Sequence, residues 1–396
     1  MPAPVRGRFV VRLAVFYAAL FLVSGVQQPF FPLWLGAKGL DATLVGVVLA
    51  MPMLVRVAAV PLATAVADRR DALRGALIAA AAASATAYAL VGAMDGVTAI
   101  VVACAVAAAA YAPVTPLTDA YALRGLAGSG RAYGPVRLWG SAAYLAGMFV
   151  TGAAADLMPA RYLIWLIVGF AAAAALAALM LAPLPQGGEA SEPAVNFAAN
   201  PDAPPSSRHL LRQPAVLAVL GAAALIQASH AVYYGFSVLA WTSVGFGGMA
   251  VAVLWAIGVL AEIVLFALQA RLPRWLTPAR LLIAGGVGAV LRWSAMAFGP
   301  PAELLPILQV LHALSFGATH LGALAYLARM AAPRQAARAQ GYLAIALGLA
   351  HAGAMLLSGW LYAMSAGGAY AAMALMAAAG GAGALVAERI ERRIMK

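Results

Sequence analysis

Residues 247–270 read GGMAVAVLWAIGVLAEIVLFALQA, an unbroken apolar run whose single charged residue is Glu262. About 20 mostly apolar residues are enough for a helix to cross the hydrocarbon core of a bilayer. The rest of the chain has the same character, since 65% of its 396 residues are hydrophobic and only 10% are charged. A soluble domain carries about 25% charged residues, which help to cover its surface. The composition therefore predicts a membrane protein.

Eleven more apolar runs of similar length, together with 247–270, predict twelve transmembrane helices. No segment alternates polar and apolar residues as the strands of an outer-membrane barrel do. The first run lacks a small-residue cleavage site, so we expect it to be a span and not a removed signal peptide. The eleven runs are 11–34, 43–64, 75–94, 97–120, 137–155, 160–182, 214–241, 281–299, 304–328, 341–363 and 369–387.

The positions of the basic residues predict the orientation of these helices. All but four of the 25 lysines and arginines fall in the termini and in alternate loops, on one side of the membrane. The opposite side has only Lys38 and Arg161, while Arg56 and Arg292 lie within spans. Because basic residues concentrate in cytoplasmic loops, we expect both termini to be cytoplasmic, in a bacterial inner membrane. The net charge of +12 then reflects orientation in the lipid bilayer, and it does not indicate nucleic-acid binding.

The longest polar stretch, 183–213, is rich in proline and separates two sets of six spans. We expect an N-terminal half over 1–182, a cytoplasmic linker over 183–213 and a C-terminal half over 214–396. This layout is typical of transporters built from two parallel repeats, which bind substrate near the bilayer midplane where the repeats meet. The predicted fold is an all-α membrane protein with twelve transmembrane helices in two six-helix halves.

Several kinds of chemistry lack their sequence signals. No Gly-x4-Gly-Lys-Ser/Thr motif occurs, which argues against an ATP-driven pump. The single cysteine, Cys104, has no intrachain disulfide partner, and the five histidines lack the spacing of metal ligands. We therefore expect no enzyme activity, no metal and no bound cofactor.

Four charged residues lie inside predicted spans, namely Arg56, Asp119, Glu262 and Arg292, and Arg137 begins another span. A charge at the centre of a bilayer costs about 2.5–3.5 kcal/mol on insertion scales, so such residues are functional candidates by default. Three arginines and two acids leave one excess positive charge, which a monocarboxylate would neutralise. A proton on either acid raises the excess to two. The excess positive charge inside the spans therefore favours an anionic substrate whose transport is coupled to protons.

Asp119 shares a predicted helix face with Tyr111 and Thr115, because residues four apart lie above one another. Pro113 and Pro116 loosen the same helix, as helices that line a cavity often require. Arg137 begins the next span after a short loop, so we expect it to approach Asp119. The simpler alternative is an ion pair at the cytoplasmic gate.

A second group of polar residues lies in the C-terminal half. Glu262 and Arg292 are near the middle of consecutive spans, and His312 lies at a similar depth in the next one. The span 214–241 adds His230 and two neighbouring tyrosines, Tyr233 and Tyr234. A lone histidine in a helix is more often a packing residue, and we interpret His351 in this way.

Three stretches of the sequence are distinctive. Residues 133–140 read YGPVRLWG, residues 229–237 read SHAVYYGFS, and residues 258–268 read GVLAEIVLFAL. In these stretches the chain resembles the 3-phenylpropionate permease family of the major facilitator superfamily, and the resemblance covers nearly the whole chain. It implies import of aromatic acids together with protons.

The chain is also similar, more distantly, to lactose-permease-like proton symporters. In those proteins an acid and an arginine on spans 4 and 5 hold the substrate, which corresponds to Asp119 and Arg137 here. An acid, an arginine and a histidine on spans 8, 9 and 10 form the coupling group, which corresponds to Glu262, Arg292 and His312. One turn after that histidine the sugar symporters carry a glutamate as proton carrier, where this sequence has Ser315.

These observations predict a monomeric symporter that imports a small aromatic monocarboxylate, driven by the proton gradient. We expect Glu262 to carry the proton and Arg292 or Arg56 to bind the carboxylate, so that substrate competes with Glu262 for Arg292. Aromatic contacts are worth about 0.5–1.5 kcal/mol beyond burial and would hold the ring. A sugar or nucleoside symporter, a drug-efflux antiporter and a non-transporting sensor remain alternatives. The aromatic residues expected at the substrate are Tyr111, Tyr144, Tyr233, Tyr234 and Trp255.

Overall fold

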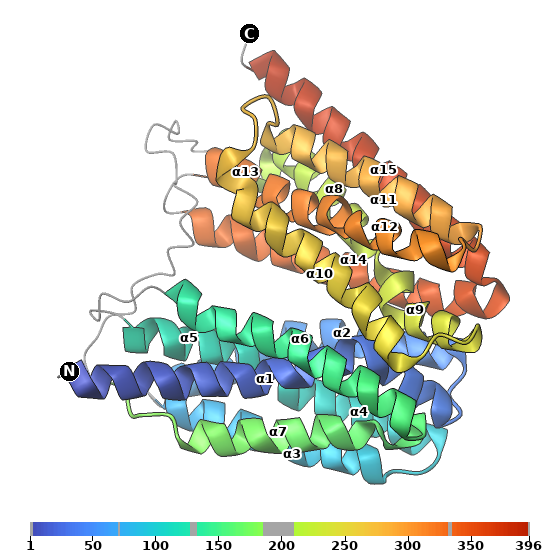
Figure 1. Cartoon of the computed structure of the whole chain (residues 1–396). Coiled ribbons are helices and arrows are strands. Elements are labelled where there is room, and N and C mark those ends of the chain that lie inside the picture. Colours follow the sequence, from blue (N-terminus) through green and yellow to red (C-terminus); the bar gives the residue numbers. More distant parts are fainter. Residues whose placement is uncertain (1–2, 70–71, 127–132, 185–209, 332–334, 395–396) are drawn as a thin grey trace. The chain divides into compact units, whose positions relative to one another are not determined.

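The computed structural model describes residues 3–69, 72–126, 133–184, 210–331 and 335–394 (Figure 1). Every regular element in these ranges is helical. Most of the predicted linker 183–213 lies outside the described residues, as does Arg131 in the loop before Tyr133. The described residues form two compact units. The first unit comprises the residues up to 184 together with 238–253, and the second comprises 210–237 and 254–394.

The helices of the first unit follow the predicted spans closely. The predicted span 97–120 is divided into two helices at Ala112, next to Pro113, as the proline indicated. The elements of this unit are α1 (Ala3–Ala37), α2 (Ala42–Arg69), α3 (Leu73–Ala93), α4 (Val97–Tyr111), α5 (Val114–Leu126), α6 (Tyr133–Leu157), η1 (Ala160–Tyr162) and α7 (Ile164–Leu179).

Helix α1 is at the centre of the first unit, packed against α6 and α7. The side chains of Phe9, Leu13, Phe16 and Leu20 follow one another along its buried face at spacings of three and four residues. Gly147 on α6 permits the close approach of α1, because a Cβ atom there would lie 2.8 Å from the carbonyl oxygen of Leu22. The apolar face of α1 therefore forms a hydrophobic core with the helices packed against it.

The remaining predicted spans belong to the second unit, apart from residues 238–253, and two of these spans are interrupted. The span 214–241 is formed by α8 and α9, and the span 304–328 is formed by α12, the π-helical segment η5 and α13. The elements from residue 210 onward are η2 (Leu210–Arg212), α8 (Pro214–Ala228), α9 (Ala231–Ser243), α10 (Gly248–Leu268), η3 (Gln269–Arg271), α11 (Pro278–Ala297), η4 (Ala302–Leu304), α12 (Leu305–Val310), η5 (Ala313–Ala318), α13 (Thr319–Met330), α14 (Ala336–Met364) and α15 (Ala366–Ile394).

Among the described residues, 11 helical segments have the length and composition needed to cross a membrane. The twelfth long segment, α11, lies at the predicted ninth span and carries Arg292 in its interior. The all-α membrane architecture predicted from the apolar runs is confirmed.

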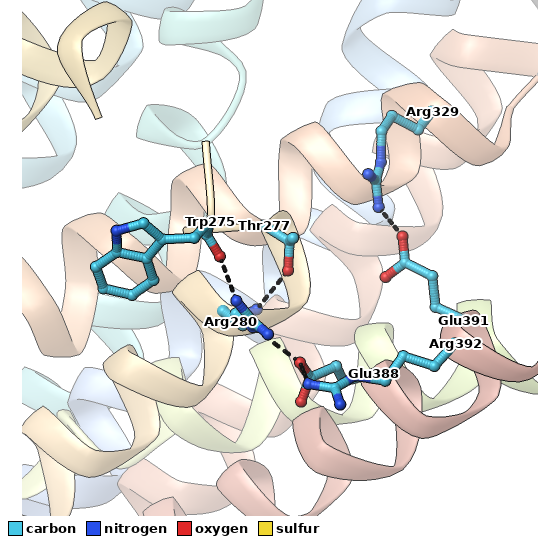
Figure 2. Close-up of polar contacts among 7 residues, drawn as sticks. All are labelled: Trp275, Thr277, Arg280, Arg329, Glu388, Glu391 and Arg392. Atoms are coloured by element: carbon cyan, nitrogen blue, oxygen red, sulfur yellow. Dashed lines mark hydrogen bonds and ion pairs between the residues drawn. The ribbon is translucent and has the colours of Figure 1, made fainter. Parts of the chain in front are cut away.

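Ion pairs join the ends of three helices in the second unit (Figure 2). Glu388 of α15 accepts hydrogen bonds from Arg280 of α11, at 3.0 Å, and from Arg392, at 2.6 Å. Glu391 of α15 pairs with Arg329 at the end of α13. These arginines belong to the predicted cytoplasmic side, where exposed ion pairs contribute only about 0–1 kcal/mol each. Their main structural effect is to fix the end of α15 against α11 and α13.

Candidate transport site

The helix interruptions of the second unit fall at two predicted site residues. His230 separates α8 from α9, and His312 lies between α12 and the π-helical segment η5. Irregular backbone at membrane depth is tolerated only where it is buried in protein or lines a cavity. Segments of π-helix inside longer helices frequently occur at functional sites. The backbone therefore marks the same region as the charges do.

Side chains satisfy the carbonyl groups that the first interruption frees. The Oγ atom of Ser229 donates to the Ile226 carbonyl at 2.6 Å. His230 Nδ1 lies 3.2 Å and 3.1 Å from the carbonyl oxygens of Ile226 and Gln227. A ring nitrogen facing two acceptors carries the hydrogen, so the Nε2 atom of His230 is the acceptor. It receives the hydroxyl hydrogen of Ser315 over 3.0 Å.

Arg292 is completely buried, with 0% of its surface exposed. Its Nη1 atom donates to Nδ1 of His312 at 3.1 Å, and its Nη2 atom donates to Oε1 of Gln309 at 2.5 Å. The rings of Tyr233 and Trp293 flank the guanidinium, with centroids 4.4 Å and 4.6 Å from Cζ. Neutral acceptors and aromatic faces thus replace water around this charge. The Nε atom has no hydrogen-bond partner among the described residues.

His312 lies between Arg292 and Glu262. Because Nδ1 of His312 accepts from Arg292, its Nε2 atom carries the hydrogen of the neutral ring. That atom is 3.5 Å from Oε2 of Glu262, whose side chain is 18% exposed. The predicted direct competition for Arg292 therefore needs correction, since no ion pair joins Arg292 to Glu262 within the described ranges. The observed order is Arg292, His312, Glu262.

Two glycines allow α10 and the interrupted helix to approach each other at this point. A Cβ atom on Gly258 of α10 would lie 3.3 Å from Cβ of His312. A Cβ atom on Gly317 of η5 would lie 3.5 Å from Cγ of Glu262. The close contact between these segments brings the carboxylate to the histidine.

The predicted aromatic residues of the second unit form one connected group. Tyr233 stacks on Trp255 with ring centroids 4.8 Å apart, and Tyr234 stacks on His230 at 5.6 Å. Tyr233 and Trp255 are buried, while Tyr234 is half-buried. Tyr233 covers Arg292, so Tyr234 is the more accessible of the two tyrosines.

The helical period places Phe316 and His320 on roughly the same face as His312, but sequence reasoning missed other residues of this site. Gln309 lies three positions from His312, so the same period carried a signal for it. Tyr370 carried no such signal, since it belongs to α15 and reaches the group by packing on Trp293. Among the described residues, polar atoms buried without a partner include Nε2 of Gln309, Nε1 of Trp255 and the hydroxyl of Tyr370.

The first unit holds Asp119 in a different way from the predicted one. The hydroxyl groups of Tyr17 and Tyr133 donate to Oδ1 of Asp119, at 2.6 Å and 2.8 Å. Arg137 lies over the ring of Phe21, 4.0 Å from its centroid, and over the ring of Tyr17. The expected approach of Arg137 to Asp119 is not an ion pair, because tyrosine hydroxyls bind the carboxylate and aromatic faces bind the guanidinium.

The other predicted residues of the first unit are also located. Tyr111 shares a hydrogen bond of 2.9 Å with Ser24 of α1. Tyr144 donates to Gln28 of α1 at 2.7 Å. Arg56 of α2 is exposed and, within the described part of the chain, has no hydrogen bond or ion pair. The three intramembrane arginines thus differ in access, from exposed Arg56 to buried Arg292.

No group of three or more His, Cys, Asp or Glu side chains in the described ranges has the arrangement of a metal site.

Comparison with known proteins gives consistent results. The chain matches the MFS_1 like family over residues 10–372. It is 29% identical over 371 residues to a probable 3-phenylpropionic acid transporter of Escherichia coli (strain K12), covering 92% of this chain and 94% of that protein. The crystal structure of nucleoside transporter NupG is similar, with a TM-score of 0.81 and 15% identity over 96% of this chain and 98% of that chain.

A bacterial homolog of the human lysosomal transporter Spinster has a TM-score of 0.72 at 15% identity, over 98% of both chains. At these identities the solved structures show a shared fold. The family match spans most of the chain and confirms the resemblance seen in the sequence. The chain therefore belongs to the MFS_1 like family and is a multi-pass membrane protein, a secondary transporter of small molecules and not an enzyme.

Proposed function

We propose that this transporter imports a small aromatic monocarboxylate, similar to 3-phenylpropionate, together with protons across a bacterial inner membrane by alternating access. The observation that carries the proposal is the chain Arg292–His312–Glu262, in which a buried cation is linked through a histidine to a partly exposed acid. The E. coli relative, described as a probable 3-phenylpropionic acid transporter, supports the substrate class. The transporter acts as a monomer.

Glu262 is the proton carrier. The position of the carrier in sugar symporters is occupied by Ser315, whose hydroxyl is bound to His230. A protonated Glu262 has no charge to attract His312, so proton binding releases the carboxyl group from the histidine. The hydrogen bond between Arg292 and His312 keeps the ring in place during this change.

Arg56 binds the substrate carboxylate. It is exposed and unpaired among the described residues, whereas Arg292 is buried and uses both Nη atoms. An arginine within a span is costly unless it faces water or an anion, which a carboxylate supplies. Arg137 is a second arginine of the first unit that lies inside the predicted membrane region. Its guanidinium lies over the rings of Phe21 and Tyr17 and not against a carboxylate. Arg292 then acts on the coupling acid and not on the substrate.

The test is an uptake screen in proteoliposomes that contain the full chain, with and without an acidic external medium. We expect 3-phenylpropionate to accumulate only under the pH gradient, and its uncharged amide to compete weakly and not to accumulate. Accumulation of neutral sugars or nucleosides would identify a different symporter, and substrate exit against proton entry would identify an efflux antiporter. A protein that moves none of these compounds fits a sensor.

A further inference from the structure

A stack of three rings runs along the interrupted helix of the second unit. The rings of His312 and Phe316 lie 5.1 Å apart at an interplanar angle of 15°. The rings of Phe316 and His320 lie 6.1 Å apart at 11°. The stack therefore has a titratable ring at each end and an inert ring in the middle.

Glu262 lies alongside this stack. Its carboxylate is 3.5 Å from His312 at one end, and its Cγ atom lies beside Gly317, in the middle. Phe266, four positions after Glu262 on α10, packs against the ring of His320. The turn of α10 that carries Glu262 and Phe266 therefore lies along the stack from His312 to His320. The two histidines are eight positions apart in the sequence, with the π-helical segment η5 between them.

His320 has no role in the network around Arg292. Its side chain is half-buried, and no hydrogen bond to it occurs in the described residues. On its other side lies Phe266 of α10, with ring centroids 6.3 Å apart. The elements packed against α13 carry other ionisable groups. These are Arg280 and Arg292 of α11 and Arg338, Tyr342, His351 and Tyr362 of α14.

We propose that His320 is the relay through which Glu262 releases its proton toward the cytoplasm, a step that rests on the proposed proton-coupled function. With both termini cytoplasmic, α13 runs toward the cytoplasm, so His320 lies further in that direction than His312. The carboxyl group of Glu262 gives its proton to a ring nitrogen of His320, which leaves a carboxylate and an imidazolium. The imidazolium then loses the proton to cytoplasmic water. Histidine suits this step because its charge changes near neutral pH.

The alternative role for His320 is packing, since its ring lies between Phe316 and Phe266. Two substitutions separate the roles. His320→Phe keeps a ring in the stack and removes the titratable nitrogens. His320→Glu removes the ring and keeps a group that binds protons. The matched control is His351→Phe, because His351 is also half-buried against an aromatic ring, Tyr234, and lies outside the contacts of Glu262.

The experiment compares two rates in proteoliposomes, substrate counterflow at equal pH and accumulation driven by an acidic exterior. For His320→Phe we expect counterflow close to that of the unmodified protein and proton-driven accumulation slower by about 100-fold, the lower range for loss of a positioned proton-transfer group. His320→Glu should recover part of the accumulation, and His351→Phe should behave like the unmodified protein.

Normal accumulation by His320→Phe would overturn the relay. Equal losses of counterflow and accumulation in His320→Phe and His320→Glu would also overturn it, because counterflow at equal pH does not need a proton relay. Failure of the proposed function has a different signature, since the unmodified protein would then show no accumulation under the gradient, and the relay would fall with it.

Discussion

The substitution Arg292→Lys keeps the buried positive charge and removes the two guanidinium nitrogens, Nη1 and Nη2, that donate hydrogen bonds. In the protein one guanidinium reaches both Nδ1 of His312, at 3.1 Å, and Oε1 of Gln309, at 2.5 Å. A lysine ammonium is a compact point charge and cannot reproduce this planar geometry. A hydrogen bond to a charged group contributes about 1.5–3 kcal/mol. Losing one of the two should lower the free energy of unfolding by about 1.5–3 kcal/mol, or about 10- to 100-fold in the ratio of folded to unfolded protein.

Reversible unfolding by SDS in mixed micelles, followed by tryptophan fluorescence, measures this change, because Trp293 packs directly on Arg292. The matched control is Arg161→Lys. The Arg161 guanidinium lies over the exposed ring of Tyr162 and donates no hydrogen bond within the described residues, so we expect a change within about 0.5 kcal/mol.

A double-mutant cycle tests the partner. Gln309→Leu removes the acceptor of the shorter hydrogen bond, so its effect and that of Arg292→Lys should combine with an interaction energy of about 0.5–3 kcal/mol. The reasoning is refuted if Arg292→Lys is as stable as the unmodified protein, or if the effects of Arg292→Lys and Gln309→Leu simply add. Either result would mean that the two hydrogen bonds of the Arg292 guanidinium do not stabilise the site.

Three other predictions follow from the first unit. Arg56→Gln should weaken binding of 3-phenylpropionate by about tenfold, or 1.4 kcal/mol, and leave binding of the amide unchanged; equal losses in competition assays would exclude an anion role. Gly147→Ala should destabilise the protein by about 1–3 kcal/mol in the SDS assay, because its Cβ would meet backbone on α1, whereas Gly169→Ala, with open space around it, should not. Tyr133→Phe removes one of two donors to Asp119 and should cost about 1.5–3 kcal/mol of stability; a neutral effect would mean that water replaces the hydroxyl.

Much of the fold was predictable because a bilayer imposes simple requirements. Each span needs a long apolar run, and these runs located the long helices of both units. Pro113 and Pro116 predicted a loosened helix, and the structure divides it into α4 and α5 next to Pro113, since proline lacks the donor that an α-helix needs. The charges inside the spans also directed attention to Glu262 and Arg292, which both contact His312 in the structure, and their role in transport stays a prediction.

The remaining details depend on contacts between distant helices. Neither interruption, at His230 or at His312, has a proline beside it that would predict it. The break at His230 is instead stabilised by side chains that bind the freed carbonyl groups. The position of His312 between Arg292 and Glu262 depends on side-chain rotamers, which a helical period does not give. The donors to Asp119 include Tyr17, 102 positions away in the sequence. The spacing of residues predicts which side chains share one face of a helix, but it does not predict which residues of other helices contact that face.

The most direct test of the account is to record 3-phenylpropionate uptake and proton entry together, in proteoliposomes containing the unmodified protein or Glu262→Gln. The unmodified protein should acidify the vesicle interior as substrate enters. Glu262→Gln should exchange labelled for unlabelled substrate, move no protons with it and fail to accumulate it. If Glu262→Gln still concentrates 3-phenylpropionate and carries protons at the normal ratio, Glu262 is not the proton carrier and the central claim is wrong.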